Sequence, residues 1–168
     1  MICESERLAL RRAQPGDAAF LLRLLNQQSW IRNIGDRGVR TLGDAERYID
    51  TRMQEPFRAL GYGMNVIELK ATGEPIGLCG LVRRDTLPEP DLGFALLDAH
   101  EGHGYALEAA TAVMAHARAV LKIRRILAIV TPANERSVRL LAKLGFRLER
   151  RARLSPGAEE LDIYAAPG

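Results

Sequence analysis

The feature that most constrains the fold is a junction between an apolar segment and a long alanine-rich segment. Residues Asp91 to Leu97 are mostly apolar, which is typical of a central strand. Further along, one face of a helix is marked by Leu107, Ala110, Met114, Ala117 and Leu121. Gly102 and Gly104 lie between the two segments. A strand, a glycine-rich turn and a helix in this order predict an α/β fold.

The turn itself, Gly102-x-Gly104-x-Ala106, predicts a pyrophosphate cradle. The first backbone N–H groups of a helix lack partners, and the helix dipole favours an anion there. Glycines let a phosphate approach the backbone. A tight turn that needs glycine only for positive φ explains the motif equally well. No Gly-Lys-Ser/Thr follows and the third glycine is missing, so neither a P-loop nor a dinucleotide-binding fingerprint is indicated.

Hydrophobic periodicity and turn residues predict the remaining elements. The expected order is β-α-α-β-β-β-α-β-α-β-β, in a single domain across residues 1–168. We expect Trp30 to Arg40 to form a loop, and the helix that starts at Thr41 to end or break at Pro56. The expected strands are 8–10, 64–69, 75–82, 91–97, 126–130, 146–151 and 160–165, and the other expected helices surround 20–25, 107–121 and 134–144.

Composition excludes several classes of protein. The 24 basic and 21 acidic residues leave a net charge of +3, the arginines are scattered and aromatics are only 5%, so no nucleic-acid partner is expected. Cys3 and Cys79 form no CxxC pair, and we expect no metal. No apolar run is long enough to span a membrane, and the N-terminal segment does not resemble a signal peptide. We therefore expect a cytoplasmic protein without a membrane partner.

A second constellation lies on the last predicted helix. Asn134 and Ser137 are three residues apart, so they share a face at its start. Read alone, Asn134 is a helix cap and Ser137 an ordinary first-turn residue. The strand before this helix is expected beside Asp91–Leu97. That placement would bring both side chains near the glycine-rich turn.

Together, the two stretches resemble the GNAT superfamily of acetyl-CoA-dependent N-acetyltransferases. Its Q/R-x-x-G-x-G/A motif is matched at Gly104 and Ala106, with Glu101 departing at the first position. Asn134-x-x-Ser137-x-x-Leu140-x-x-Lys143-x-Gly145-Phe146 is similar to the family's second motif. Three further stretches resemble the branch that acetylates ribosomal-protein N-termini: Ser5-Glu6-Arg7-Leu8-x-Leu10-Arg11, Asp91-Leu92-Gly93-Phe94 and Gly104-Tyr105-Ala106-x-Glu108-Ala109.

This resemblance, which runs from about residue 5 to about 165, implies a mixed, splayed central sheet flanked by helices. It implies transfer of an acetyl group from acetyl-CoA to a primary amine, with a protein or peptide N-terminal amine as the leading acceptor. A small-molecule amine, such as an antibiotic or polyamine, is the alternative acceptor. A non-catalytic acyl-CoA-binding regulatory module is an alternative of another class. The family also implies a homodimer.

The resemblance also implies roles for individual residues. The pantetheine arm would pair with the backbone of Phe94, Ala95, Leu96 and Leu97, and the N–H of Leu96 or Leu97 would polarise the thioester carbonyl. The diphosphate would lie on the amides of Gly102, His103, Gly104, Tyr105 and Ala106. Asn134 would bind the pantetheine arm, and Ser137 would protonate the departing thiolate. Asp91 is the expected base, with Glu68 as its substitute; a structural ion pair between Asp91 and an arginine is equally compatible.

Charged segments around these motifs predict the acceptor site and the phosphate contacts. The acceptor-site candidate is the loop 30–38, although Trp30 and Ile34 are equally compatible with the core. Arg32, Arg37 and Arg40 favour peptides or acidic small molecules over polycations. Arg136, Arg139 and Lys143 form a cationic stripe that either meets cofactor phosphates or faces solvent. The arginines of 147–153 suit an exposed edge strand or an acidic partner.

Overall fold

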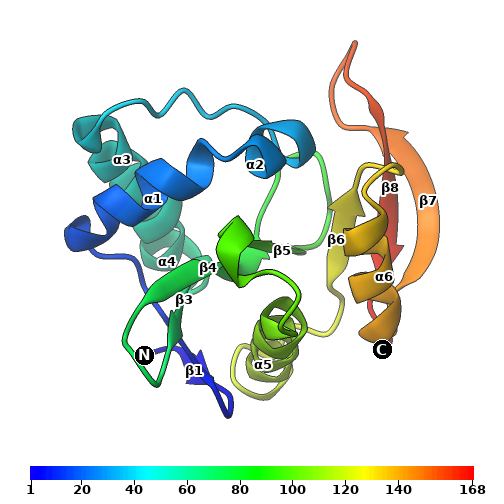
Figure 1. Cartoon of the computed structure of the whole chain (residues 1–168). Helices are drawn as coiled ribbons and strands as arrows, with labels where there is room; N and C mark the ends of the chain where they lie inside the picture. Colours follow the sequence, from blue (N-terminus) through cyan, green and yellow to red (C-terminus); the bar gives the residue numbers. More distant parts are fainter.

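The computed structural model describes all residues, 1–168, and shows one eight-stranded sheet flanked by helices (Figure 1). The strand order is β1-β2-β3-β4-β5-β6-β8-β7. All neighbours pair antiparallel except β5 and β6, which are parallel. The strands are β1 (Cys3–Glu4), β2 (Leu8–Arg11), β3 (Met64–Leu69), β4 (Pro75–Val82), β5 (Asp91–Leu96), β6 (Leu127–Val130), β7 (Arg147–Arg153) and β8 (Glu160–Ala165).

The helices cover both faces of the sheet and so create two apolar cores. The helical elements are η1 (Pro15–Asp17), α1 (Ala18–Leu25), α2 (Gln28–Asn33), α3 (Leu42–Tyr48), η2 (Ile49–Gln54), α4 (Glu55–Leu60), η3 (Asp98–His100), α5 (Tyr105–Ala119) and α6 (Glu135–Lys143). The alanine face of α5 packs with Leu92, Phe94 and Leu96 of β5. Helices α1 to α3 and η2 cover the opposite face, where they meet Ala95 and Leu97. Alternate residues of β5 therefore face different helical layers.

The sheet splays between β5 and β6, as the family resemblance implied. Strand β5 pairs with β4 along its whole length, from Asp91 to Leu96. Its register with β6 holds at a single position, where Asp91 lies opposite Leu127 and the Leu127 N–H donates to the Pro90 carbonyl over 2.9 Å. Strand β6 pairs over its whole length with β8, which lies on its other side. The β6-facing edge of β5 is therefore left without a strand partner.

Two local predictions were wrong, around Trp30 and at the N-terminus, and a third, at Pro56, takes an unexpected form. Residues around Trp30 form helix α2 because burial of its indole outweighs the signal of the two glycines that follow. The break expected at Pro56 is present as a π-helical turn: α3 ends at Tyr48, η2 follows, and Pro56 lies in the first turn of α4, a position that tolerates proline. The short β1 precedes the first predicted strand, and its two residues give no periodic signal.

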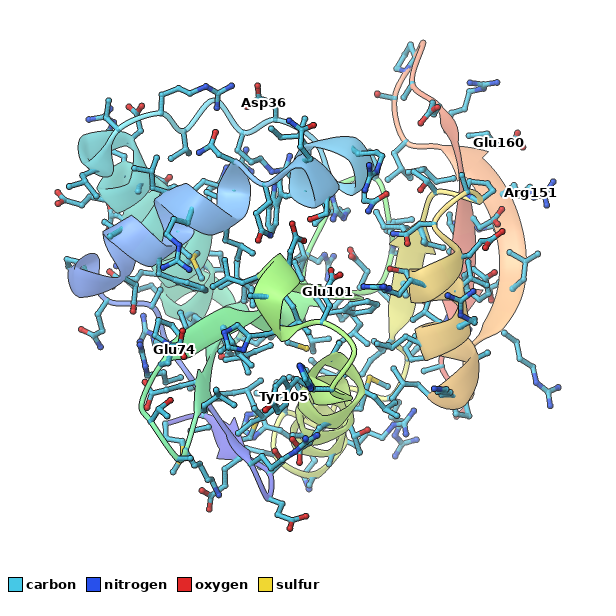
Figure 2. All side chains as sticks on the ribbon, viewed as in Figure 1. Asp36, Glu74, Glu101, Tyr105, Arg151 and Glu160 are labelled. Atoms are coloured by element: carbon cyan, nitrogen blue, oxygen red, sulfur yellow. The ribbon has the colours of Figure 1, made fainter.

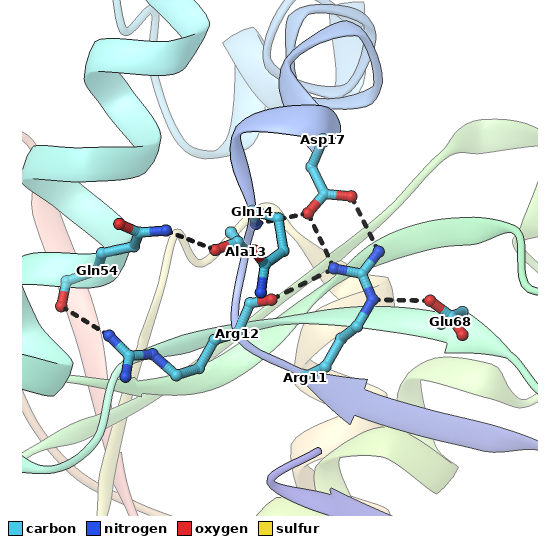
Figure 3. A network of polar contacts seen from close by, with 7 residues as sticks. All are labelled: Arg11, Arg12, Ala13, Gln14, Asp17, Gln54 and Glu68. Atoms are coloured by element: carbon cyan, nitrogen blue, oxygen red, sulfur yellow. Dashed lines mark hydrogen bonds and ion pairs between the residues drawn. The ribbon is translucent and has the colours of Figure 1, made fainter.

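A polar network fixes the start of α1 to the sheet (Figure 3). Arg11 on β2 donates from Nη1 and Nη2 to the two carboxylate oxygens of Asp17, at 2.8 and 2.9 Å. Its Nε donates to Glu68 on β3 over 2.7 Å. Burial alone would raise the pKa of Asp17, but the Arg11 guanidinium and the Gln14 N–H outweigh burial and lower that pKa. The network stabilises the layer that covers one face of the sheet.

Candidate active site

A cavity of about 530 Å³ opens where the sheet splays. Its wall is formed by β5, the turn before α5, the first turn of α5, β6 and α6 on one side, and by α2, α3, η2 and the tip of β3 on the other. Figure 2 shows Glu101 and Tyr105, from the turn and from α5, near the middle of the molecule, whereas Arg151 and Glu160 lie on the outer edge of the sheet. The cavity thus joins the glycine-rich turn to the layer that covers the opposite face.

The turn before α5 presents unpartnered backbone donors to the cavity. The N–H groups from Gly102 to Leu107 make no hydrogen bond within the protein, and the first helical bond runs from the Glu108 N–H to the Gly104 carbonyl. Gly102 and Gly104 have φ of +82° and +80°, a region that other residues adopt only with strain. No side chain caps α5. This arrangement leaves several free N–H groups together at the start of a helix, which is the geometry that an anion-binding site requires.

The hydrogen bonds of β5 correct one expected role. The N–H of Leu97 donates to the Ile76 carbonyl over 2.8 Å, and Leu97 does not line the cavity. The Leu97 N–H is therefore committed to β4, and the catalytic role that we expected for it is wrong. In an antiparallel pair the backbone groups alternate between the two edges, so the N–H groups of Phe94 and Leu96 point to the free edge instead. Both residues, and Ala95 between them, line the cavity.

Asn134 and Ser137 both line the cavity from the start of α6. Asn134 Oδ1 accepts a hydrogen bond from the Ser137 N–H over 3.3 Å, so Asn134 does cap the helix. The cap leaves the Asn134 amide group and the Ser137 hydroxyl without hydrogen bonds inside the protein. Both side chains therefore have polar groups left to bind a ligand in the cavity.

Asp91 lies at the start of β5, its side chain only 2% exposed, and it lines the cavity. Burial raises the pKa of Asp91, and the Arg84 guanidinium, whose Nε lies 2.9 Å from Oδ2, opposes part of that rise. The ion pair that we expected as an alternative is present. It does not remove Asp91 from the cavity. Glu68 is engaged by Arg11 and does not line the cavity, so it does not replace Asp91 as a base there.

Two other residues of the turn differ in their surroundings. His103, which we expected at the diphosphate, does not line the cavity. Its ring centre lies 5.7 Å from that of Tyr105. Glu101 lines the cavity and pairs with Arg136 of α6. Only the backbone of His103 is thus left for the role we assigned to it.

The opposite wall of the cavity combines aromatic, thioether and cationic side chains. It includes Trp30, Tyr48, Arg52, Met53 and Met64 together with Ile34 and Arg37 from the segment after α2. Trp30 is 6% exposed, and its buried Nε1–H has no hydrogen-bond partner. Ile34 is 41% exposed. Trp30 therefore belongs to the core and to the cavity wall at once.

Sequence reasoning identified the loop 30–38 but missed the contributions of α3, η2 and β3 to this wall. Tyr48 and Met53 look like ordinary core positions of an amphipathic helix. Nothing in the residues themselves distinguishes these positions from an ordinary core face.

Comparison with known proteins agrees with this architecture. Residues 7–147 match the acetyltransferase (GNAT) domain family. An uncharacterised N-acetyltransferase, YoaA of Bacillus subtilis, is 27% identical over 150 residues, which cover 88% of this chain and 84% of that protein. An acetyltransferase from Agrobacterium tumefaciens is 28% identical, with a TM-score of 0.81 over 98% of this chain and 93% of that one. The chain therefore belongs to the GNAT family and is an acetyltransferase.

The fold is also shared with a ribosomal-protein acetyltransferase. RimL, a ribosomal L7/L12 alpha-N-protein acetyltransferase solved with coenzyme A, is 19% identical, with a TM-score of 0.82 over 96% of this chain and 94% of that one. At this identity the likeness concerns the fold alone. No helix of the present chain is both long and apolar enough to cross a membrane, and no group of three or more His, Cys, Asp or Glu is arranged to hold a metal ion.

Proposed function

We propose that this acetyltransferase transfers the acetyl group of acetyl-CoA to the α-amine of a protein or peptide N-terminus. The observation that carries the proposal is the free edge of β5. The N–H groups of Phe94 and Leu96 face a cavity that also receives the unpartnered amides at the start of α5. One continuous surface of backbone donors thus fits an extended amide-bearing arm followed by a diphosphate.

The residues present fit acetyl-CoA at each part of that molecule. The Gly102–Leu107 amides suit the diphosphate. Arg136, Arg139 and Lys143 line the cavity from α6, where they suit the phosphates of the nucleotide end. The edge of β5 and Asn134 suit the amides of the pantetheine arm. Acetyl-CoA brings the activated thioester, and the backbone N–H of Leu96 or Phe94 is the donor for its carbonyl oxygen, a contribution of about 3 kcal/mol in comparable sites.

Proton transfers fall to two side chains that line the cavity. The carboxylate of Asp91 accepts a proton from the incoming ammonium, directly or through water. The Ser137 hydroxyl returns a proton to the departing thiolate. An α-amine has a pKa of about 7.7–8.0 and a lysine-type amine about 10.4, so Asp91, whose pKa is raised by burial, is better matched to the former. This difference supports an N-terminal α-amine over a polyamine.

Calorimetric titration of the purified protein with acetyl-CoA, followed by an acetylation assay on N-terminal peptides and on a panel of small amines, tests the proposal. We expect one-to-one binding of acetyl-CoA. We also expect the peptide to gain about 42 Da, the net C2H2O of one acetylation, at its α-amine. Binding without transfer to any amine would favour the regulatory-module alternative. Transfer only to small amines would overturn the peptide acceptor.

A further inference from the structure

The acceptor side of the cavity carries positive charge that neither the protein nor the acetyl donor accounts for. Six cationic side chains and two carboxylates line the cavity. Both carboxylates are already paired, Asp91 with Arg84 and Glu101 with Arg136. The α6 cations adjoin the donor half. Arg37 and Arg52 remain, and neither makes an ion pair or a side-chain hydrogen bond.

These two arginines come from the layer that covers the Asp91 side of the sheet. Arg37 lies in the segment between α2 and α3, and Arg52 lies in η2, whose Met53 packs in the core shared by Ala95 and Leu97. Because Asp91 alternates in step with Ala95 along β5, its carboxylate faces the same layer. The unpaired guanidinium groups and the expected base therefore line one half of the cavity, where an amine would enter.

Trp30 supplies a second, independent observation. Its indole Nε1–H is buried without an acceptor, although Trp30 lines the cavity. A buried donor with no partner destabilises the protein, and a bound acceptor atom removes that cost. One orphaned donor and two unpaired arginines on the same wall supply the kind of donors that recognise a carboxylate or phosphate.

We infer that the amine acceptor is acidic: it carries a carboxylate or phosphate close to the reacting amine, held by Arg37, Arg52 and the Nε1–H of Trp30. The inference rests on the proposed function for the transfer step itself. In a peptide, the charge would come from acidic side chains next to the N-terminal residue. In a small molecule, it would come from the amine's own acid group.

Matched acceptors separate this inference from the proposed function. The peptides Ser-Asp-Glu-Ala-amide and Ser-Asn-Gln-Ala-amide differ only in charge, as do the small amines aspartate and asparagine amide. We expect kcat/KM to be about tenfold higher for the acidic member of a pair, the ratio that one charge-assisted contact supplies. We also expect added salt to reduce this preference. A preference confined to the small amines would support the acidic acceptor while overturning the peptide as its source.

Substitutions test whether Arg37 and Arg52 cause the preference for acidic acceptors. In Arg37→Gln and Arg52→Gln the acidic preference should fall to about threefold or less, through KM rather than kcat, while acetyl-CoA affinity is unchanged. Trp30→Phe should also reduce the preference for the acidic acceptor. Arg32→Gln is the control, since Arg32 is exposed on α2, unpaired and outside the cavity. Equal rates within each pair, a preference that survives both arginine variants, or no turnover of any acidic acceptor would overturn the inference.

Discussion

Arg84 donates from its Nε to Asp91 Oδ2 over 2.9 Å at the point where β5 begins to part from β6. Burial and this ion pair have opposite effects on the pKa of Asp91, the base that we propose. Burial raises the pKa of Asp91, whereas Arg84 lowers it and keeps more of the carboxylate ionised. The guanidinium therefore tunes the pH at which Asp91 becomes able to accept a proton.

This relationship predicts a pH profile. A base works only when ionised, so kcat/KM should fall as the pH drops through the pKa of Asp91, and this acid limb should lie above the value of about 3.9 for an exposed aspartate. In Arg84→Gln the limb should move to higher pH, because the group that lowers the pKa is gone. Asp91→Asn should lose about 10²-fold in rate and lack the limb. An unchanged profile in Asp91→Asn would exclude Asp91 as the base.

Ser137 is predicted to act on the leaving group and not on binding. In Ser137→Ala the backbone N–H that Asn134 accepts is retained, so the start of α6 should remain intact. We expect kcat to fall by a modest factor, since a thiolate leaves readily without a proton, while the Kd for acetyl-CoA measured by calorimetry stays the same. If kcat were unchanged, the acid role would have to be abandoned.

Gly104→Ala should weaken acetyl-CoA binding at the start of α5. The φ of +80° imposes about 1 kcal/mol of strain on alanine, and relief of that strain turns the amides of the turn away from their common direction. Gly157→Ala is a matched control, because Gly157 has a φ of +77° in the turn between β7 and β8 and does not line the cavity. Both variants should unfold at lower temperature. Only Gly104→Ala should raise the Kd for acetyl-CoA, and an equal Kd in both would contradict the cradle.

The Arg11 network is predicted to stabilise the fold without touching the chemistry. Arg11→Leu leaves the carboxylates of Asp17 and Glu68 unpaired, and because part of the network is exposed we expect a loss of about 2 kcal/mol in the free energy of unfolding. The exposed pairs of Arg125 provide the comparison, and Arg125→Leu should have little effect on unfolding.

The pH dependence of this loss has a definite sign. The pKa of Asp17 is lowered in the folded state, so its stabilisation is present above the unfolded value of about 3.9 and disappears as the pH falls through the folded pKa. The difference between wild type and Arg11→Leu should therefore shrink in acid. Urea unfolding at neutral pH and near pH 3 measures it, and a difference that grew in acid would be inconsistent with the network.

Much of the fold was predictable because its central elements carry strong periodic signals. The apolar run of β5, the alanine face of α5 and the paired runs of β3 and β4 each specify both their type and their neighbours. The splay between β5 and β6 came from the family resemblance. Helix α2 was missed because its six residues are too few to establish a period, so the burial of Trp30 decides its conformation.

The location of the candidate site was predictable from the glycine-rich turn and the strand before it. Which backbone N–H groups of that strand point into the cavity was not predictable. Whether Leu96 or Leu97 points its N–H to the free edge is set by the register of β5 against β4, and a long connection without a tight turn leaves that register unspecified in the sequence. Likewise, nothing local indicates that the ring of His103 lies outside the cavity or that Arg52 lies in its wall.

The free edge of β5 has a consequence for how such a protein can diversify. Its groups are main-chain atoms, present whatever side chains the strand carries, so substitutions along β5 would leave the proposed surface for the acetyl donor in place. The layer around Trp30, Tyr48 and Arg52 is made of side chains and is open to replacement one residue at a time. Under the proposed function, the splay would keep the group that is transferred the same, and substitutions in the covering helices would change the amine that accepts it.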